Sequence, residues 1–144
     1  MTYLLDVNLL IAFCDPFHAH HQHAHRWFSA EKVVNWATCP LTENGFVRIT
    51  SGSTYPGGHG TVVEQLDQLR QSCRQSGHIF WPDDLSIRDK DMWSMLQTIN
   101  PHQLTDLYLL ALAVKRGGKL ASFDQRIPAH LIQGGKAALH IVRA

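Results

Sequence analysis

Apolar residues in this chain fall into short runs, which are separated by longer segments that mix apolar and polar residues. The short runs are rich in β-branched and apolar residues and predict strands at residues 3–5, 33–38, 79–81, 119–123 and 139–142. The longer segments predict helices at residues 7–13, 18–32, 61–76, 87–99 and 104–116, and Pro40 begins another helix that holds Glu43. Strands that alternate with helices indicate an α/β fold around a mainly parallel sheet of about five strands.

The length and composition of the chain limit the classes of protein to which it can belong. At 144 residues and 44% hydrophobic, it has the size of one compact domain, which we expect to span residues 1–144. A net charge of +1 neither supports nor excludes a nucleic-acid partner, because a local basic patch can hold a polyanion. The three cysteines form no Cys-x-x-Cys pair, which indicates reduced thiols. No basic leader and no apolar run long enough to span a bilayer are present, so we expect a cytoplasmic protein without membrane association.

Four acidic residues lie where predicted strands end or predicted helices begin. Asp6 and Asp124 directly follow strands, whereas Glu43 and Asp106 lie in the first turns of helices. Taken singly, each has an ordinary explanation as a turn, capping or helix-dipole residue. In a parallel sheet, however, the carboxyl ends of strands and the starts of the following helices lie along one edge. We therefore expect the four carboxylates to converge in one pocket.

A pocket of this kind needs a cation. Two carboxylates about 4 Å apart repel each other by roughly 4 kcal/mol at an effective dielectric constant of about 20. Ligands that are all oxygen favour Mg²⁺ or Mn²⁺ over zinc. A magnesium ion held by carboxylates suits the hydrolysis of phosphodiesters, because it activates water and offsets charge in the transition state.

The segments that carry these acids also resemble a known family. Residues 4–10, 41–48, 104–113 and 122–124 resemble, in this order, the acidic motifs of PIN-domain proteins, and most of all those of the VapC toxin group of type II toxin-antitoxin systems. The resemblance implies a Rossmann-like αβα sandwich and a Mg²⁺- or Mn²⁺-dependent endoribonuclease. It also implies a homodimer that a cognate VapB-type antitoxin neutralises.

Carried over residue by residue, the resemblance assigns roles to individual positions. The family's acidic quartet, both catalytic and metal-binding, corresponds to Asp6, Glu43, Asp106 and Asp124. Asn8 corresponds to a polar position that supports the first aspartate, and Thr105 or Ser122 could hydrogen-bond substrate or a metal-bound water. Basic residues near these motifs are candidates for contacts with RNA phosphates, with Arg48 the first choice, followed by Arg26, Lys115 and Arg126.

The histidines between residues 18 and 25 have no assigned role. His21 and His25 are four residues apart and would share one face of a helix, but no cysteine or acid at ligand spacing completes a zinc site. A surface helix that approaches RNA is the favoured interpretation of this segment.

Two other functions remain open. The first is a PIN-fold module that binds RNA or protein but no longer hydrolyses RNA. The complete set of four acids argues against it. The second is a phosphotransferase that uses Asp6 as a covalent nucleophile. A haloacid-dehalogenase-like site would carry a second aspartate two residues later, where this chain has Asn8.

Overall fold

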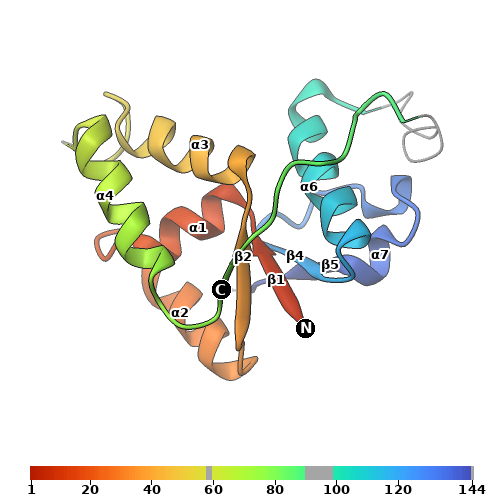
Figure 1. Ribbon diagram of the computed structural model, residues 1–144, viewed down its shortest axis with the longest axis horizontal. Coiled ribbons are helices and arrows are strands. Elements are labelled where there is room, and N and C mark those ends of the chain that lie inside the picture. Colours follow the sequence, from red (N-terminus) through yellow and green to blue (C-terminus); the bar gives the residue numbers. More distant parts are fainter. Residues whose placement is uncertain (58–59, 90–98, 144) are drawn as a thin grey trace.

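A parallel sheet of five strands forms the centre of the molecule. The computed structural model describes residues 1–57, 60–89 and 99–143 (Figure 1). The strands are β1 (Thr2–Leu5), β2 (Asn35–Thr38), β3 (His78–Phe80), β4 (Lys119–Ser122) and β5 (Leu139–Ile141). They pair in the order β3-β2-β1-β4-β5, and every pairing is parallel. This arrangement confirms the α/β class expected from the sequence.

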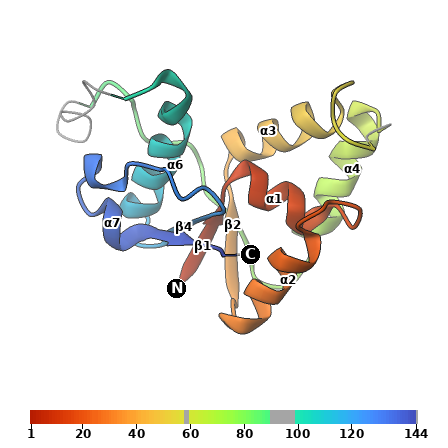
Figure 2. The ribbon, with the colours of Figure 1, turned by 180° about the vertical axis from the view of Figure 1, so that it is seen from behind.

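Helices cover both faces of the sheet, as the two opposite views in Figures 1 and 2 show. One side carries α1 (Val7–Cys14), α2 (His21–Ala30), α3 (Pro40–Thr50) and α4 (Val62–Cys73). The other side carries α6 (Leu104–Lys115) and α7 (Gly135–Ala138), with short 3-10 turns at Pro101–Gln103 and Ala129–Leu131. None of the helices in the described ranges is both long and apolar enough to cross a bilayer.

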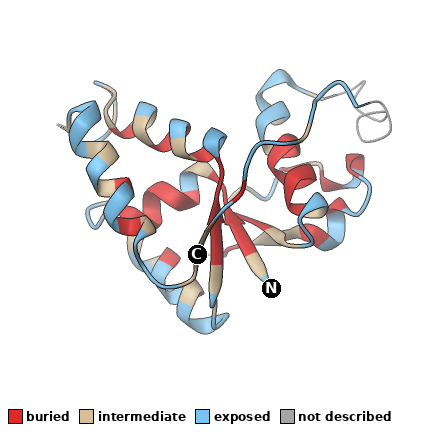
Figure 3. Cartoon of the chain, in the orientation of Figure 1, coloured by how far each residue is buried: buried red, intermediate tan, exposed pale blue. Residues whose placement is uncertain are grey.

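The sheet separates two apolar clusters, which appear as buried segments on either side of it in Figure 3. Successive side chains of a strand point to opposite faces, so Leu4 packs with α6 whereas Tyr3 and Leu5 pack with α1 and α2. Because both of its faces are covered, β1 carries the unbroken apolar run Tyr3-Leu4-Leu5 rather than an alternation of apolar and polar residues. Residues 107–113 of α6 are all buried, which explains the uniformly apolar sequence of that helix.

Most predicted elements are confirmed to within a few residues. The hydrophobic pattern correctly placed strands β1 to β5, helices α1 to α4 and helix α6. Most of the helix expected at residues 87–99 falls outside the described residues. The pattern missed α7, which is a single turn preceded by Gly134 in the left-handed conformation with φ of 77°. A helix this short has no repeating apolar face for a sequence pattern to detect.

Gly77 fixes the approach of the chain to β3. Its φ is 89°, and a Cβ atom built there would lie 1.8 Å from the carbonyl oxygen of Val34. We therefore expect Gly77→Ala to lower the free energy of unfolding by more than about 2 kcal/mol, measured by urea denaturation. Gly57→Ala is the matched control, because Gly57 has a φ of 68° but no atom within 4 Å of the added Cβ. The control should lose only about 1 kcal/mol, and equal losses in the two variants would contradict this account.

Candidate active site

Asp6 connects the end of β1 to the start of α1. Its Oδ1 accepts a hydrogen bond from the backbone N–H of Leu9 at 2.8 Å, so it serves as the N-cap of the helix. Its own N–H donates to the carbonyl oxygen of Ala121 on β4 at 3.1 Å. The side chain is only 5% exposed. The carboxylate is therefore held in one orientation at the carboxyl edge of the sheet.

Ser122 links Asp6 to Asp124. The hydroxyl of Ser122 donates to Asp6 Oδ2 and accepts from the backbone N–H of Asp124 at 3.0 Å. Asp124 in turn accepts at Oδ1 from the backbone N–H of Arg126 at 2.9 Å, and Arg126 Nε lies 3.3 Å from the same oxygen. The acids that follow β1 and β4 thus belong to one hydrogen-bonded group, and Ser122 contacts an acid rather than facing open solvent.

Asp106 interacts electrostatically with these two acids. It lies in the first turn of α6 and is partly buried. The pKa of Asp6 is raised to about 6, mainly by burial and to a smaller extent by the charges of Asp106 and Asp124, whereas the hydrogen bonds from Ser122 and Leu9 lower it. Burial and the charge of Asp124 also raise the pKa of Asp106. The three aspartates are therefore electrostatic neighbours.

Glu43 is engaged elsewhere. It lies in the first turn of α3, where its Oε2 accepts a hydrogen bond of 2.7 Å from the hydroxyl of Thr38 at the end of β2. The same hydroxyl lies 2.8 Å from Nε2 of His78 on β3. Burial and the charge of Glu43 raise the pKa of Cys73 to about 11, whereas burial lowers the pKa of His78 against the opposing effect of the Glu43 charge. The structure thus groups three of the four predicted acids, while Glu43 faces β2 and β3.

The sequence contained only weak signals for the partners of Glu43. Thr38 ends a predicted strand five residues before Glu43, and Cys73 and His78 are separated by a turn between a predicted helix and a predicted strand. Cys73 has no Cys-x-x-Cys partner and lies on the apolar face of a predicted helix, so the sequence indicated a reduced thiol and no ligand role. Its closeness to His78 and Glu43 depends on the packing of α4 and β3 beside α3, which sequence spacing does not encode.

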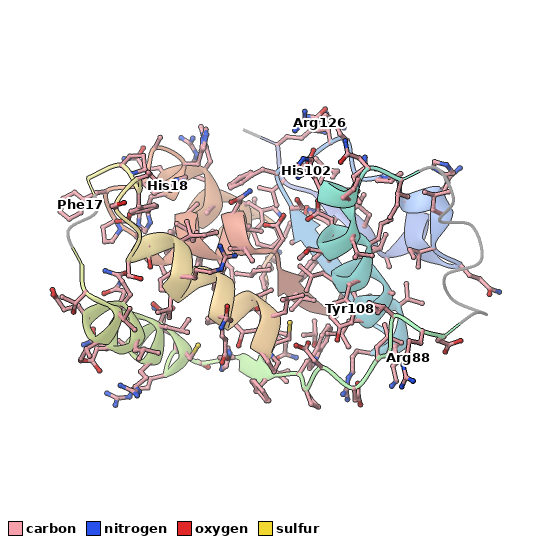
Figure 4. All side chains as sticks on the ribbon, turned by 90° about the horizontal axis from the view of Figure 1, so that it is seen from above. Phe17, His18, Arg88, His102, Tyr108 and Arg126 are labelled. Atoms are coloured by element: carbon pink, nitrogen blue, oxygen red, sulfur yellow. The ribbon has the colours of Figure 1, made fainter. Side chains whose placement is uncertain are left out.

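The remaining predicted residues occupy different parts of the surface. A hollow of about 420 Å³ is lined by Asp6, Asn8, Phe123, Asp124, Gln125 and Arg126. Asn8 and Arg126 therefore lie at the acidic site, and Figure 4 shows the side chain of Arg126 at the outer edge of the molecule. Thr105 is exposed in the first turn of α6.

The other three basic candidates do not line this hollow. Arg48 lines a separate groove between α3 and α4, and Arg26 is exposed on α2. Lys115 lies at the last residue of α6 and pairs with Asp84 at 3.4 Å, about 13 Å along the helix axis from Asp106. Of the four basic residues named from the sequence, only Arg126 contacts an acid of the site.

Two histidines of the cluster attach α2 to α1. Nδ1 of His21 lies 2.8 Å from the carbonyl oxygen of Ala12, and Nε2 of His25 lies 2.9 Å from that of Phe13. Carbonyl oxygens only accept, so both ring nitrogens donate to the otherwise unpaired carbonyls of the last turn of α1. The ring of His25 also stacks on Phe13, with centroids 4.5 Å apart. These side chains therefore have a structural role at the α1–α2 contact.

The three aspartates offer only oxygen ligands. Among the described residues, the acid, histidine or cysteine group whose ligand atoms all lie within 4.8 Å of one another is not the aspartate group, so at least one pair of these aspartates is further apart. Magnesium usually keeps several of its waters and takes only one or two carboxylates directly. A hard divalent cation therefore fits this set of residues, and it would offset the repulsion that raises the pKa of Asp6.

Comparison with known proteins gives consistent relatives. The chain is 38% identical over 134 residues to ribonuclease VapC44 of Mycobacterium tuberculosis, which covers 93% of this chain and 94% of the relative. It is 43% identical over 129 residues to ribonuclease VapC39 of the same organism, covering 86% and 89%. No family model matches the chain.

A solved structure agrees with the fold. The crystal structure of VapC20 from Mycobacterium tuberculosis, described as a Sarcin-Ricin loop cleaving toxin, superimposes with a TM-score of 0.62. The match covers 90% of this chain and 95% of VapC20, at 11% sequence identity, and so supports the fold alone. The identity to the curated ribonucleases over most of both chains, with this shared fold, confirms the resemblance drawn from the acidic motifs. The chain belongs to the VapC family of ribonucleases, the toxins of type II toxin-antitoxin systems.

Proposed function

We propose that Asp6, Asp106 and Asp124 hold Mg²⁺ or Mn²⁺ and form the catalytic centre of an endoribonuclease. The observation that carries the proposal is the burial of an ionisable Asp6 beside two further carboxylates, which raises its pKa to about 6. Keeping all three ionised at neutral pH is unfavourable without a cation. A bound divalent cation supplies Lewis-acid chemistry, in which water is activated and the charge on the phosphate is offset.

The residues around this centre position the reacting groups. Leu9 and Ser122 fix both oxygens of Asp6, so that the carboxylate needs no reorganisation to act as a ligand. Arg126 holds Oδ1 of Asp124, and its side chain is 90% exposed at the edge of the hollow, where it can contact an RNA phosphate. Asn8, exposed on the same hollow, is positioned to meet the substrate.

Glu43 is the fourth acid of the proposal. Glu43 lies in the first turn of α3, and Asp6 directly precedes α1. Both helices follow parallel strands, so both acids lie at the carboxyl edge of the sheet. Glu43 can join the other acids only if its side chain leaves the hydroxyl of Thr38. We therefore propose that Glu43 would contact the cation or the substrate only after this hydrogen bond breaks.

The partners in this proposal follow from the family. The substrate is RNA, a VapB-type antitoxin neutralises the toxin, and the toxin forms a homodimer. RNA substrates and the free cysteines Cys14, Cys39 and Cys73 both suit the cytoplasm.

The test is RNA cleavage by antitoxin-free protein from which metal has been removed. We expect no cleavage in the presence of a chelator and internal cleavage of labelled RNA when Mg²⁺ or Mn²⁺ is restored, because the carboxylates alone do not activate water. Folded protein that cleaves no RNA with either ion would overturn the proposal. Phosphate trapped covalently on Asp6 would instead indicate a phosphotransferase.

A further inference from the structure

A second group of metal-ligating side chains lies outside the aspartate site. Glu43, Cys73 and His78 each offer one ligand atom, and these atoms all lie within 4.8 Å of one another. The three residues come from different elements, namely the first turn of α3, the end of α4 and the start of β3. All three are partly buried, so a cation could enter from solvent without unfolding the site.

The hydroxyl of Thr38 brings these side chains together. It donates to Glu43 Oε2 at 2.7 Å and lies 2.8 Å from His78 Nε2, and Cys73 Sγ lies within 4.8 Å of the ligand atoms of both residues. Thr38 is fully buried, so its hydroxyl has a fixed position on β2. Three potential ligands on three elements thus point to one place in the metal-free protein.

The geometry points to a zinc site. We propose that Glu43, Cys73 and His78 bind Zn²⁺ in preference to Mg²⁺, and that binding there keeps Glu43 from the aspartate site and slows RNA cleavage. The second half of this inference rests on the proposed function, whereas the first half does not.

The chemistry of the ligands determines the choice of ion. A thiolate and an imidazole are zinc ligands that Mg²⁺ avoids, and three protein ligands leave the fourth tetrahedral position for water. Ligand atoms around tetrahedral zinc lie about 3.6 Å apart, so no pair of ligand atoms in the group would need to approach by more than about 1.2 Å.

His78 and Cys73 can each reach the protonation state in which they bind a metal. A neutral imidazole gives Zn²⁺ a lone pair from one ring nitrogen, and a proton displaced from that nitrogen moves to the other ring nitrogen or to solvent. The Cys73 thiol gives up its proton to solvent when a Zn–S bond forms. The bond between Thr38 and Glu43 is replaced by a bond between the carboxylate and the ion.

Metal binding is tested first, without any reference to catalysis. Metal-free protein is titrated with Co²⁺, whose bond to a thiolate gives a charge-transfer absorption band in the near ultraviolet. We expect this band in the wild-type protein and its loss when Zn²⁺ is added. Cys73→Ser should abolish the band, and His78→Gln should weaken Zn²⁺ binding by at least about tenfold. Cys14→Ala is the thiol control, since Cys14 lies outside the group and should leave the band unchanged.

A wild-type protein without the band, or a Cys73→Ser protein that retains it, would overturn the site.

The inhibitory role is tested by adding one equivalent of Zn²⁺ to Mg²⁺-dependent RNA cleavage. Cleavage should slow in wild type and stay unchanged in Cys73→Ser, whereas equal inhibition in both would overturn this role. Wild-type protein that shows the band but cleaves no RNA overturns the proposed function and the inhibitory role, while the zinc site stands.

Discussion

Replacing Asp6 by asparagine should abolish metal-dependent RNA cleavage and, at neutral pH, make the metal-free protein more stable. Burial and the charges of Asp106 and Asp124 raise the pKa of Asp6 from its ordinary value of 3.8 to about 6. Holding this buried carboxylate ionised at pH 7 therefore costs the folded state about 3 kcal/mol. Asparagine removes that cost and can still accept the N–H of Leu9 as a helix cap.

The raised pKa of Asp6 makes the stability of the metal-free protein depend on pH in a characteristic direction. Because the folded-state pKa is raised, the folded protein binds a proton more tightly than the unfolded chain does. Stability from this group is fully present below about pH 4 and is lost as the pH rises through about 6. Urea unfolding of metal-free wild type should show this loss, and Asp6→Asn should not. A variant that is less stable than wild type at neutral pH would contradict the account.

Mg²⁺ should reverse the loss of stability. An ion that binds only the folded, ionised site raises the free energy of unfolding by RT ln(1 + [ion]/Kd), and it competes with the proton on Asp6. The increase in melting temperature on adding Mg²⁺ should therefore be larger at about pH 8 than at about pH 5. Asp6→Asn should show little increase at either pH.

Asp106→Asn should reduce the rate of RNA cleavage by at least about 100-fold. A bound cation contributes several kcal/mol to transition-state stabilisation, and each 1.4 kcal/mol or so corresponds to about a factor of ten in rate. Stability should change little. The variant loses a favourable charge at the start of α6, worth about 0.3–1 kcal/mol, but also loses the repulsion from Asp124.

The matched control for both aspartate variants is Asp67→Asn. Asp67 is an exposed acid on α4 that pairs with Arg70 at 2.8 Å, and it takes no part in the aspartate site. Single-turnover cleavage should proceed at the wild-type rate in this control. An Asp106→Asn protein that cleaves RNA as fast as the control would show that Asp106 is not required for cleavage.

The fold was predictable because the local pattern and the buried structure agree. The Tyr3-Leu4-Leu5 run has both of its faces covered in the structure, and residues 107–113 form a helix that is apolar all round because it is wholly buried. The positions of Asp6 and Asp124 followed from the strands that precede them. An acid directly after a parallel strand must lie at the carboxyl edge of the sheet.

What the sequence left undetermined depends on contacts between distant elements. Placing Glu43 at the start of a helix did not reveal that the hydroxyl of Thr38, which also contacts His78, holds its carboxylate toward β2 and β3. Likewise, the spacing of His21 and His25 predicted that the two side chains share a helix face. It did not predict that this face would meet the unpaired carbonyls at the end of α1. Both features depend on how helices pack on the sheet, which hydrophobic periodicity constrains only loosely.

The claim that three aspartates hold the catalytic metal is tested most directly by Mn²⁺ binding to metal-free protein, followed by electron paramagnetic resonance. Wild type and Asp67→Asn should bind Mn²⁺ with the same affinity, whereas Asp6→Asn and Asp106→Asn should each bind at least about tenfold more weakly. Asp6→Asn and Asp106→Asn proteins that bind Mn²⁺ as tightly as wild type would contradict the account.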